Sequence, residues 1–413
     1  MKAVEVIGGY PLNGEIKIQG SKNGILPVLA ASVLQKGVCI LHNCPDIRDV
    51  RETLAILREL GAACEMKKHT ITIDTTGIQT KVIPKEKTEK MRSSLLFLGA
   101  LLGRFGEGVL GKAGGCNIGR RPIDMHMEAF QKMGILMEEQ EDFIAAKGRL
   151  KGVDITLRLP SVGATENIMI AAALAEGVTI IYNAAQEPEI VELAGFLKKM
   201  GAGIYGEGSP AIIISGVKEL HGIEYSIMPD RIVAGTYLLG AVATRGKVRL
   251  HQVEHEHLGA VKVILKQMGA VIRETPDGIY VNGETAGKAV EKVKTEPYPG
   301  FPTDLQSVLL STLAVAKGES CLYENIFENR YRTVTELRKM GADISIEDNK
   351  LKVRGVDSLY GCDVEGQELR GFAALVIAGL AAEGRTRIEN KGYVERGYEN
   401  IVRDLLALGA KII

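Results

Sequence analysis

Residues 170–183, IAAALAEGVTIIYN, and residues 377–390, IAGLAAEGRTRIEN, carry the pattern from which the fold can be predicted. In each stretch an alanine- and leucine-rich segment of helical character is followed by a glycine and a short strand-forming run. Glycine enters the left-handed position after a helix without steric cost, so we expect each of these glycines to end a helix. The glycine of this phrase recurs at Gly37, Gly108, Gly177, Gly246, Gly318 and Gly384.

A second phrase runs in step with the first: an amphipathic helix, a glycine, usually an alanine, and then a strand. Its glycines are about 70 residues apart, a period too long for a small solenoid repeat. We therefore predict an α/β fold of six repeated units, with three units sharing each of two cores. Ligand chemistry is expected in the cleft between two such domains, where pockets preferentially lie. The glycines of this phrase are Gly61, Gly134, Gly201, Gly269, Gly341 and Gly409.

Composition and charge exclude several classes of protein. Apolar residues make up 46% and charged residues 25% of the 413 residues, the balance of an ordinary globular protein. Lysine plus arginine and aspartate plus glutamate both total 51, so no overall field favours nucleic acid or a membrane surface. The N-terminus lacks an apolar signal region, and we expect a cytoplasmic protein without membrane spans. The six scattered cysteines are expected to be reduced and mostly buried.

The start of the alanine-rich helix is polar in all six units. Lys22, Arg92, Arg231 and Arg370 place a cation there, which an isolated helix start disfavours but which suits an anion held by free backbone N–H groups. The alternative is that the polar residues are only N-caps. The residues open to that interpretation are Ser21, Ser161, Thr165, Thr303 and Asp304.

Further arginines lie in the loops that follow the glycine-strand phrase. Together with the helix-start cations they could converge on one compact ligand with phosphate and carboxylate groups, since a guanidinium binds both with two hydrogen bonds. The residues of this expected cluster are Lys22, Arg92, Arg121, Arg330, Arg370 and Arg396.

The loop around Cys116 combines a thiol with four glycines and the cations Arg120 and Arg121, which would lower the thiol pKa. It can be interpreted as a lid that carries a reactive cysteine, or as a small apolar residue in a glycine-rich turn. In the stretch HQVEHEH (251–257) the three histidines match no established zinc spacing, so a solvated loop is favoured over a metal site. The segment GEGVLGKAGG has neither a dinucleotide-binding nor a P-loop arrangement of glycines.

As a set, several short stretches resemble the enolpyruvyl transferases, and within them the branch that acts on a nucleotide sugar. The resemblance covers essentially the whole chain. Its pieces are GSKNGILPVLAAS (20–32), GGCNIGRRPID (114–124), SVGAT (161–165), QEPEIV (186–191), MPDR (228–231), FPTDLQ (301–306), FENR (327–330) and ERGYE (395–399).

The resemblance implies a two-domain inside-out α/β barrel, with domains at 22–229 and at 1–21 together with 230–413. It also implies transfer of the enolpyruvyl group of phosphoenolpyruvate to the 3-hydroxyl of UDP-N-acetylglucosamine, the first committed step of peptidoglycan precursor synthesis. Phosphate is then lost from a tetrahedral ketal. No cofactor, metal, nucleic acid or membrane is implied as a partner.

Site roles follow from the same resemblance. Cys116 would protonate C3 of phosphoenolpyruvate, and Asp304 would take the proton of the sugar hydroxyl. Lys22, Arg121 and Arg396 resemble the phosphate-binding set. The remaining substrate-binding residues are Arg330 and Arg370 facing the carboxylate with Arg92 nearby, Asn23 at the sugar, Ser161, Val162 and Gly163 at the diphosphate, and Asp124, Arg231, Ile326 and Glu368.

Three positions depart from the family's pattern. Glu368 stands where aspartate is usual, Leu159 and Pro160 stand where a basic side chain is common, and Val233 replaces a frequently acidic residue. A carboxylate displaced by one methylene matters in a preorganised site. These departures leave open a diverged paralogue with another hydroxyl acceptor, or a non-catalytic regulator that binds nucleotide sugar.

Overall fold

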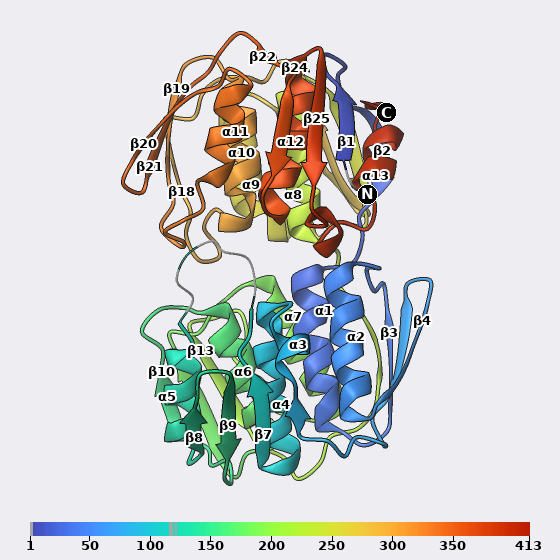
Figure 1. Ribbon diagram of the computed structural model, residues 1–413, viewed down its shortest axis with the longest axis vertical. Coiled ribbons are helices and arrows are strands. Elements are labelled where there is room, and N and C mark those ends of the chain that lie inside the picture. The colour runs from blue at the N-terminus through green and yellow to red at the C-terminus, as the bar shows by residue number, and fades with distance from the viewer. Residues whose placement is uncertain (1–2, 115–118, 120–121) are drawn as a thin grey trace. The chain divides into compact units, whose positions relative to one another are not determined.

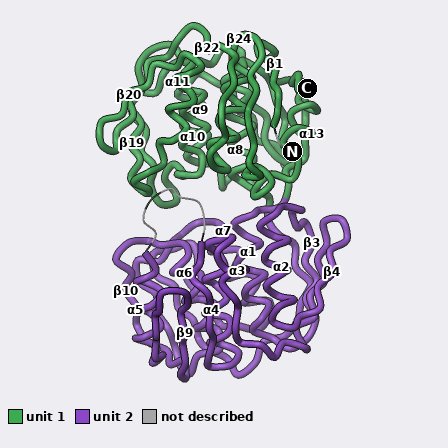
Figure 2. Tube along the Cα trace, viewed as in Figure 1, with its two compact units in different colours: residues 1–19, 117–120, 229–413 green, residues 20–116, 121–228 purple. Residues whose placement is uncertain are grey.

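The computed structural model describes residues 3–114, Gly119 and 122–413, which form two compact units (Figure 2). Unit 1 contains residues 3–19, Gly119 and 229–413, and unit 2 contains residues 20–114 and 122–228. Cys116, Arg120 and Arg121 lie outside the described residues.

Unit 2 is built from helices and short strands in alternation (Figure 1). In chain order its elements are α1 (Lys22–Ala31), η1 (Ser32–Leu34), β3 (Val38–His42), α2 (Arg48–Leu60), β4 (Ala63–Lys67), β5 (Thr70–Asp74), β6 (Val82–Ile83), α3 (Lys85–Thr88), η2 (Arg92–Leu95), α4 (Leu96–Phe105), β7 (Glu107–Gly111), α5 (Asp124–Lys132), β8 (Leu136–Glu139), β9 (Phe143–Lys147), β10 (Asp154–Thr156), α6 (Val162–Ala172), β11 (Val178–Tyr182), α7 (Pro188–Met200), β12 (Gly203–Tyr205), β13 (Ala211–Ser215) and β14 (Glu224–Ser226).

Unit 1 repeats the same alternation and also takes in the first two strands of the chain. Its elements are β1 (Ala3–Ile7), β2 (Asn13–Lys17), α8 (Arg231–Ala243), β15 (Lys247–His251), η3 (His255–Leu258), α9 (Gly259–Gln267), β16 (Val271–Thr275), β17 (Gly278–Asn282), β18 (Lys292–Lys294), η4 (Thr303–Leu305), α10 (Gln306–Ala314), β19 (Glu319–Tyr323), α11 (Arg332–Lys339), β20 (Asp343–Glu347), β21 (Lys350–Arg354), β22 (Leu359–Tyr360), β23 (Asp363–Gly366), α12 (Leu369–Ala381), β24 (Ala382–Glu383), β25 (Arg385–Asn390), η5 (Val394–Arg396), α13 (Ile401–Ala407) and β26 (Lys411–Ile412).

Six four-stranded sheets, three in each unit, share one design. In each, a parallel edge strand pairs with the strand that follows the alanine-rich helix, and two antiparallel strands complete the sheet. The sequence prediction of six repeated α/β units is therefore confirmed. The strand orders are β14-β3-β5-β4, β6-β7-β9-β8, β10-β11-β13-β12, β2-β15-β17-β16, β18-β19-β21-β20 and β23-β25-β1-β26.

Three sheets take a strand from a distant part of the chain. β1 pairs with β25 and β26, β2 pairs in parallel with β15, and β14 pairs in parallel with β3. Each unit is thus closed by strands that are remote in sequence. The N-terminal segment consequently belongs to the same unit as the C-terminal half.

The alanine-rich helices form the core of each unit, with the sheets around them. Every residue of α8 and α10 is buried, and so is α12 from Leu369 to Leu380. In unit 2, α4 packs against α6 at Gly99, where a Cβ would lie 2.4 Å from Asn167 Oδ1. Small residues therefore set how closely these helices approach, which agrees with the alanine-rich pattern.

Most of the expected helix-ending glycines adopt positive φ. All six glycines of the second phrase do so, for example Gly61 at 107° and Gly201 at 115°. For the first phrase the prediction holds at four positions and is wrong at Gly108 and Gly246, because Gly106 (70°) and Arg245 (58°) take the left-handed conformation instead. Gly246 is needed for another reason: a Cβ there would lie 2.0 Å from the Leu12 carbonyl oxygen.

The five described cysteines are free thiols. Cys39 and Cys44 are buried, whereas Cys64, Cys321 and Cys362 are half-buried, so the expectation that most cysteines are buried does not hold for the described ones. Among the described residues, no helix combines the length and the apolar character needed to cross a membrane.

Candidate functional site

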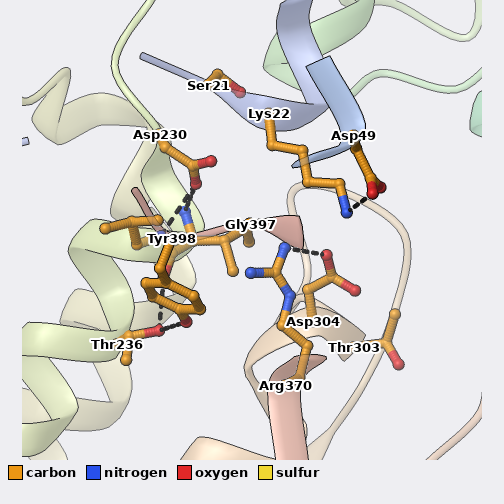
Figure 3. A network of polar contacts seen from close by, with 12 residues as sticks. Ser21, Lys22, Asp49, Asp230, Thr236, Thr303, Asp304, Arg370, Gly397 and Tyr398 are labelled. Carbon is orange, nitrogen blue, oxygen red and sulfur yellow. Dashed lines mark hydrogen bonds and ion pairs between the residues drawn. The ribbon is translucent and has the colours of Figure 1, made fainter. Parts of the chain in front are cut away.

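Asp304 in unit 1 is held between two arginines (Figure 3 shows the pair with Arg370). Its Oδ1 lies 2.9 Å from Arg330 Nη2 and its Oδ2 lies 2.8 Å from Arg370 Nη2. Asp304 comes from η4, Arg330 from the loop before α11, and Arg370 from the first turn of α12. Two adjacent repeats are therefore needed to assemble this contact, because η4 and the loop before α11 belong to one repeat and α12 to the next. The contact brings three residues of the sequence prediction together.

The two arginines determine the charge on Asp304. Both arginine side chains are 4% exposed, while that of Asp304 is 27% exposed. Burial by itself raises the pKa of Asp304, but the charges and hydrogen bonds of Arg370 and Arg330 outweigh it and hold this pKa well below its usual range. Asp304 is thus a carboxylate at neutral pH.

Each of the two arginines also has a nitrogen that is not used in the contact with Asp304. Arg330 Nε and Arg370 Nη1 are buried, and within the described part of the chain neither has a hydrogen-bond partner. Buried donors without partners are costly, and groups of this kind point to a ligand. An anion bound beside Asp304 could use them.

Arg370 is oriented from behind by an aromatic ring. Its guanidinium carbon lies 6.0 Å from the ring centroid of Tyr398, which is fully buried. The Tyr398 hydroxyl is 2.8 Å from Thr236 Oγ1 on α8 (Figure 3). Rotation of Arg370 therefore requires movement in a packed core, which preorganises the guanidinium.

In unit 2, Lys22 and Asn23 occupy the first turn of α1. Ser21 caps the helix through the N–H of Gly24 at 3.0 Å, and Lys22 Nζ forms an ion pair with Asp49 Oδ2 at 2.9 Å (Figure 3). Lys22 is 12% and Asp49 5% exposed, so both charges are largely removed from water. Asp49 was not predicted, because one acidic residue in the first turn of an amphipathic helix gives no signal of its own.

Three further predicted residues, Ser161, Val162 and Gly163, form the start of α6. Ser161 caps the helix through the N–H of Ala164, and a Cβ at Gly163 would lie 3.6 Å from Cε1 of His126. His126 is buried, and its Nδ1 lies 3.1 Å from Asn167 Nδ2. Burial first and the charge of Arg92 second lower the His126 pKa to about 3, so the ring is neutral.

Asp124 and Arg92 lie in the same unit. Asp124 begins α5 and pairs with Arg158, a basic residue one position before Leu159. Arg92 begins η2 and donates to the Pro122 carbonyl at 3.2 Å. Arg158 is thus a basic side chain next to positions 159–160, where the sequence has none, and it is paired with Asp124.

The remaining predicted residues have distinct surroundings. Glu368 caps α12 by accepting from the N–H groups of Arg370, at 2.8 Å, and Gly371. Arg231 lies in the first turn of α8, 5.6 Å from the ring centroid of Tyr298. Ile326 donates its N–H to Glu324, and Arg396 ends η5.

The N-cap alternative is right for some residues and wrong for others. Ser21 and Ser161 are caps. Thr165 lies inside α6 and accepts from the Ala185 N–H, Thr303 bonds to Arg330 and Glu324, and Asp304 is the ion-paired carboxylate.

Sequence reasoning missed a group of buried carboxyls on α6 and α7. Glu166, Glu189 and Glu192 are 6%, 2% and 6% exposed. Burial, with Glu189 adding repulsion, raises the Glu192 pKa to about 8, and burial raises that of Glu166 well above its usual value. For the residues on α7 the stretch QEPEIVE carried the signal, since Glu187, Glu189 and Glu192 lie close together at the start of that helix among apolar residues.

The histidine-rich stretch pairs with carboxylates on β2, on β16 and in the turn between β16 and β17. His251 Nδ1 lies 2.6 Å from Asp277 and its Nε2 lies 3.3 Å from Glu15, while His255 pairs with Glu274. Within the described residues no group of three or more His, Cys, Asp or Glu side chains is arranged to hold a metal ion.

Comparison with known proteins identifies the family to which this chain belongs. Residues 6–405 match the family model described as EPSP synthase (3-phosphoshikimate 1-carboxyvinyltransferase), and the chain belongs to this family of enolpyruvyl transferases. Among solved structures, the enolpyruvyl transferase NikO from Streptomyces tendae has a TM-score of 0.89 at 24% identity, covering 100% of this chain and 98% of that one. An EPSP synthase from Acinetobacter baumannii has a TM-score of 0.77 at 20% identity, with coverage of 100% and 99%.

The curated relatives are more specific. The chain is 47% identical to UDP-N-acetylglucosamine 1-carboxyvinyltransferase 1 of Carboxydothermus hydrogenoformans, over 100% of this chain and 98% of that protein. It is 45% identical to UDP-N-acetylglucosamine 1-carboxyvinyltransferase 2 of Caldanaerobacter subterraneus subsp. tengcongensis, over 100% and 99%.

Proposed function

We propose that the protein transfers the enolpyruvyl group of phosphoenolpyruvate to the 3-hydroxyl of UDP-N-acetylglucosamine and releases phosphate. Relatives 45% to 47% identical over their full length carry the name of this activity. The structural observation that carries the proposal is the contact of Asp304 with both Arg330 and Arg370. Each of these arginines also has a buried nitrogen that forms no hydrogen bond within the described residues. A carboxylate beside anion-binding guanidiniums suits a reaction between a hydroxyl and a phosphorylated carboxylic acid.

The proposed reaction is an addition followed by an elimination. The sugar oxygen forms a bond to C2 of phosphoenolpyruvate while its proton passes to Asp304, and C3 receives a proton from the Cys116 thiol. In the second stage C3 returns a proton to the Cys116 thiolate, the C2–O bond to phosphate breaks, and the C2=C3 double bond forms again, while the proton on Asp304 leaves with the phosphate. Atoms and charge balance without an oxidant, reductant or metal.

The ion pairs around Asp304 also regulate its basicity in this proposal. A carboxylate whose pKa is held low by two cations is a weak base. An anionic substrate group that accepts hydrogen bonds from Arg370 weakens that cation's hold on Asp304. The pKa of Asp304 then rises, and Asp304 becomes a better acceptor for the hydroxyl proton when substrate is bound.

Further roles are proposed on the basis of family membership. Lys22, Arg121 and Arg396 bind the phosphate, Arg92 assists, and Asn23 binds the sugar. Ser161, Val162 and Gly163 offer the start of α6 to the diphosphate, which suits a helix N-terminus. Asp124, Arg231, Ile326 and Glu368 complete the binding set, Glu368 by fixing the backbone of Arg370.

We propose that the protein works in the cytoplasm. The name of the relatives implies a precursor of peptidoglycan. We propose accordingly that the protein serves cell-wall biogenesis and, through it, cell shape and division.

Phosphate release tests the proposal. Purified protein is supplied with phosphoenolpyruvate and, in separate reactions, UDP-N-acetylglucosamine, another nucleotide sugar, shikimate 3-phosphate or no acceptor. We expect release only with UDP-N-acetylglucosamine, and loss of release in Asp304→Asn but not in Asp343→Asn, whose carboxylate is 55% exposed on β20. Release with a different acceptor would indicate the diverged enzyme, and tight binding of the nucleotide sugar without release would indicate the regulator.

A further inference from the structure

Glu324 is a buried carboxylate directly behind the Asp304 contact. It follows β19 and is 3% exposed. Its Oε1 accepts from the N–H groups of Ile326 at 2.9 Å and Phe327 at 3.1 Å, and its Oε2 accepts from Thr303 Oγ1 at 3.0 Å. One side chain therefore ties the loop that carries Ile326 to the segment that carries Asp304.

Thr303 links Glu324 to Arg330 by hydrogen bonds. Its Oγ1 lies 2.9 Å from Arg330 Nη1, which can only donate, so the hydroxyl oxygen accepts there. A hydroxyl has one proton, and with Glu324 as acceptor that proton is directed away from Arg330. Arg330 Nη1 is thereby fixed, and its other terminal nitrogen, Nη2, is presented to Asp304 at 2.9 Å.

We propose that Glu324 is a positioning residue for the reaction, acting on Asp304 through Thr303 and Arg330. The inference rests on the proposed function, because it concerns the same site. Glu324 is not proposed to touch substrate. It sets the place of Arg330, and with it the geometry and basicity of the carboxylate that accepts the hydroxyl proton.

The isosteric substitution Glu324→Gln separates this role from packing. Glutamine has the same shape but one acceptor oxygen and one donor nitrogen. If the oxygen stays with the two backbone N–H groups, the nitrogen faces Thr303 and donates where the hydroxyl donated before. If the amide is turned over, the nitrogen meets two N–H donors. Either arrangement breaks the chain of hydrogen bonds from Glu324 through Thr303 to Arg330, which we call the relay, without creating a cavity.

Four single variants of the whole protein, together with the double variant Glu324→Gln/Thr303→Val, form the test. Glu324→Gln reverses the polarity of the relay, Thr303→Val removes its hydroxyl at nearly constant volume, and Thr303→Ser keeps the hydroxyl. Glu319→Gln is the matched control, because Glu319 begins β19, the strand that Glu324 follows, and its side chain is 43% exposed and paired with Lys352 and Arg354. Far- and near-ultraviolet circular dichroism establishes that each variant is folded.

We expect Glu324→Gln and Thr303→Val to lower kcat about tenfold to a hundredfold, the scale set by small displacements in preorganised sites. The change in KM should be smaller. The acid limb of the kcat/KM profile should move to higher pH, because a displaced Arg330 lowers the Asp304 pKa less. Other titratable groups of unit 1 also lie close to the contact of Asp304 with its two arginines. Asp230 and Tyr398 affect the pKa of Arg370, and Tyr331 lies beside Glu324. None of these groups is altered in the variants.

Three results would support the inference together: the shifted acid limb, recovery of most activity in Thr303→Ser, and a double variant no worse than Thr303→Val alone. Normal kinetics in Glu324→Gln, or an additive loss in the double variant, would overturn it while leaving the proposed function intact.

A wild-type protein that releases no phosphate would instead overturn the proposed function. In that case the carboxyl carbon of Asp304, labelled with ¹³C and assigned by its loss in Asp304→Asn, still reports the relay. An unchanged Asp304 titration in Glu324→Gln would then reject the inference.

Discussion

Replacement of Glu192 by glutamine should change how the stability of the protein depends on pH. Glu192 on α7 is 6% exposed, and its Oε1 accepts the Met228 N–H at 2.7 Å. Burial and the neighbouring Glu189 raise its pKa to about 8, against 4.5 for the free side chain. The folded protein thus holds a proton that the unfolded chain releases.

The sign and size of the effect follow from linkage. A carboxyl with a raised folded-state pKa contributes stability fully below pH 4.5, and this contribution is lost as pH rises through the folded-state pKa of about 8. Each pH unit inside that window costs about 1.4 kcal/mol. Between pH 5.5 and 8 the wild type should lose roughly 3 kcal/mol through this one group. Glutamine does not ionise, so Glu192→Gln should escape the loss.

Urea unfolding of both proteins at pH 5.5 and 8 measures the effect. Subtracting the wild-type free energy of unfolding from that of Glu192→Gln at each pH removes the other titrating groups. The difference should move in favour of the variant by roughly 3 kcal/mol between the two pH values. Equal pH dependence in the two proteins would refute the assignment of a proton to Glu192.

Three further outcomes are expected. Gly99→Ala should lower the free energy of unfolding by about 1–3 kcal/mol, because its Cβ would lie 2.6 Å from the Asn167 carbonyl oxygen. The control is Gly103→Ala, whose Cβ would lie 2.7 Å from a leucine methyl group. A cost for Gly99→Ala no larger than that for Gly103→Ala would contradict the prediction. His126, with its pKa lowered to about 3, contributes stability above pH 6.5 that is lost as pH falls towards 3. Relative to His126→Gln in urea unfolding, the wild type should lose about 2.5 kcal/mol between pH 7 and 4.5, and parallel curves would show that the ring is not held neutral. Arg370→Lys should lower kcat about a hundredfold in the phosphate assay, since lysine cannot both pair with Asp304 and offer a second directed donor. Near-normal turnover of this variant would show that Arg370 does not belong to the proposed site.

The repeat was predictable because its signals are local. A glycine after a helix and a β-branched run after that glycine each reflect a few neighbouring residues, and their period revealed six units. The exceptions are instructive: at Gly246 the glycine is required by Leu12, a residue more than two hundred positions away. No local pattern could show that contact.

The strand exchanges were beyond sequence patterns for the same reason. β1, β2 and β14 are short, and nothing in their residues states which sheet they join. The resemblance to a known family, not periodicity, placed the N-terminal segment with the C-terminal half.

Within the site, charge type was predictable and partnership was not. Asp304, Arg330 and Arg370 were proposed from their motifs, and the structure brings them into contact. Their supports Thr303, Glu324 and Tyr398 had no distinct signal, because a buried hydroxyl, carboxylate or phenol looks in sequence like any other. Cys116 and Arg121 lie outside the described residues, and their roles stay predictions, as does a shared cleft.

The proposed transfer of an enolpyruvyl group requires that the bond between C2 of phosphoenolpyruvate and the bridging oxygen breaks. Phosphoenolpyruvate labelled with ¹⁸O in the bridge between C2 and phosphorus tests it directly in the presence of UDP-N-acetylglucosamine. We expect the label to leave with the phosphate while the nucleotide sugar gains an unlabelled enolpyruvyl group. Label retained on the three-carbon fragment, or an unmodified nucleotide sugar, would contradict it.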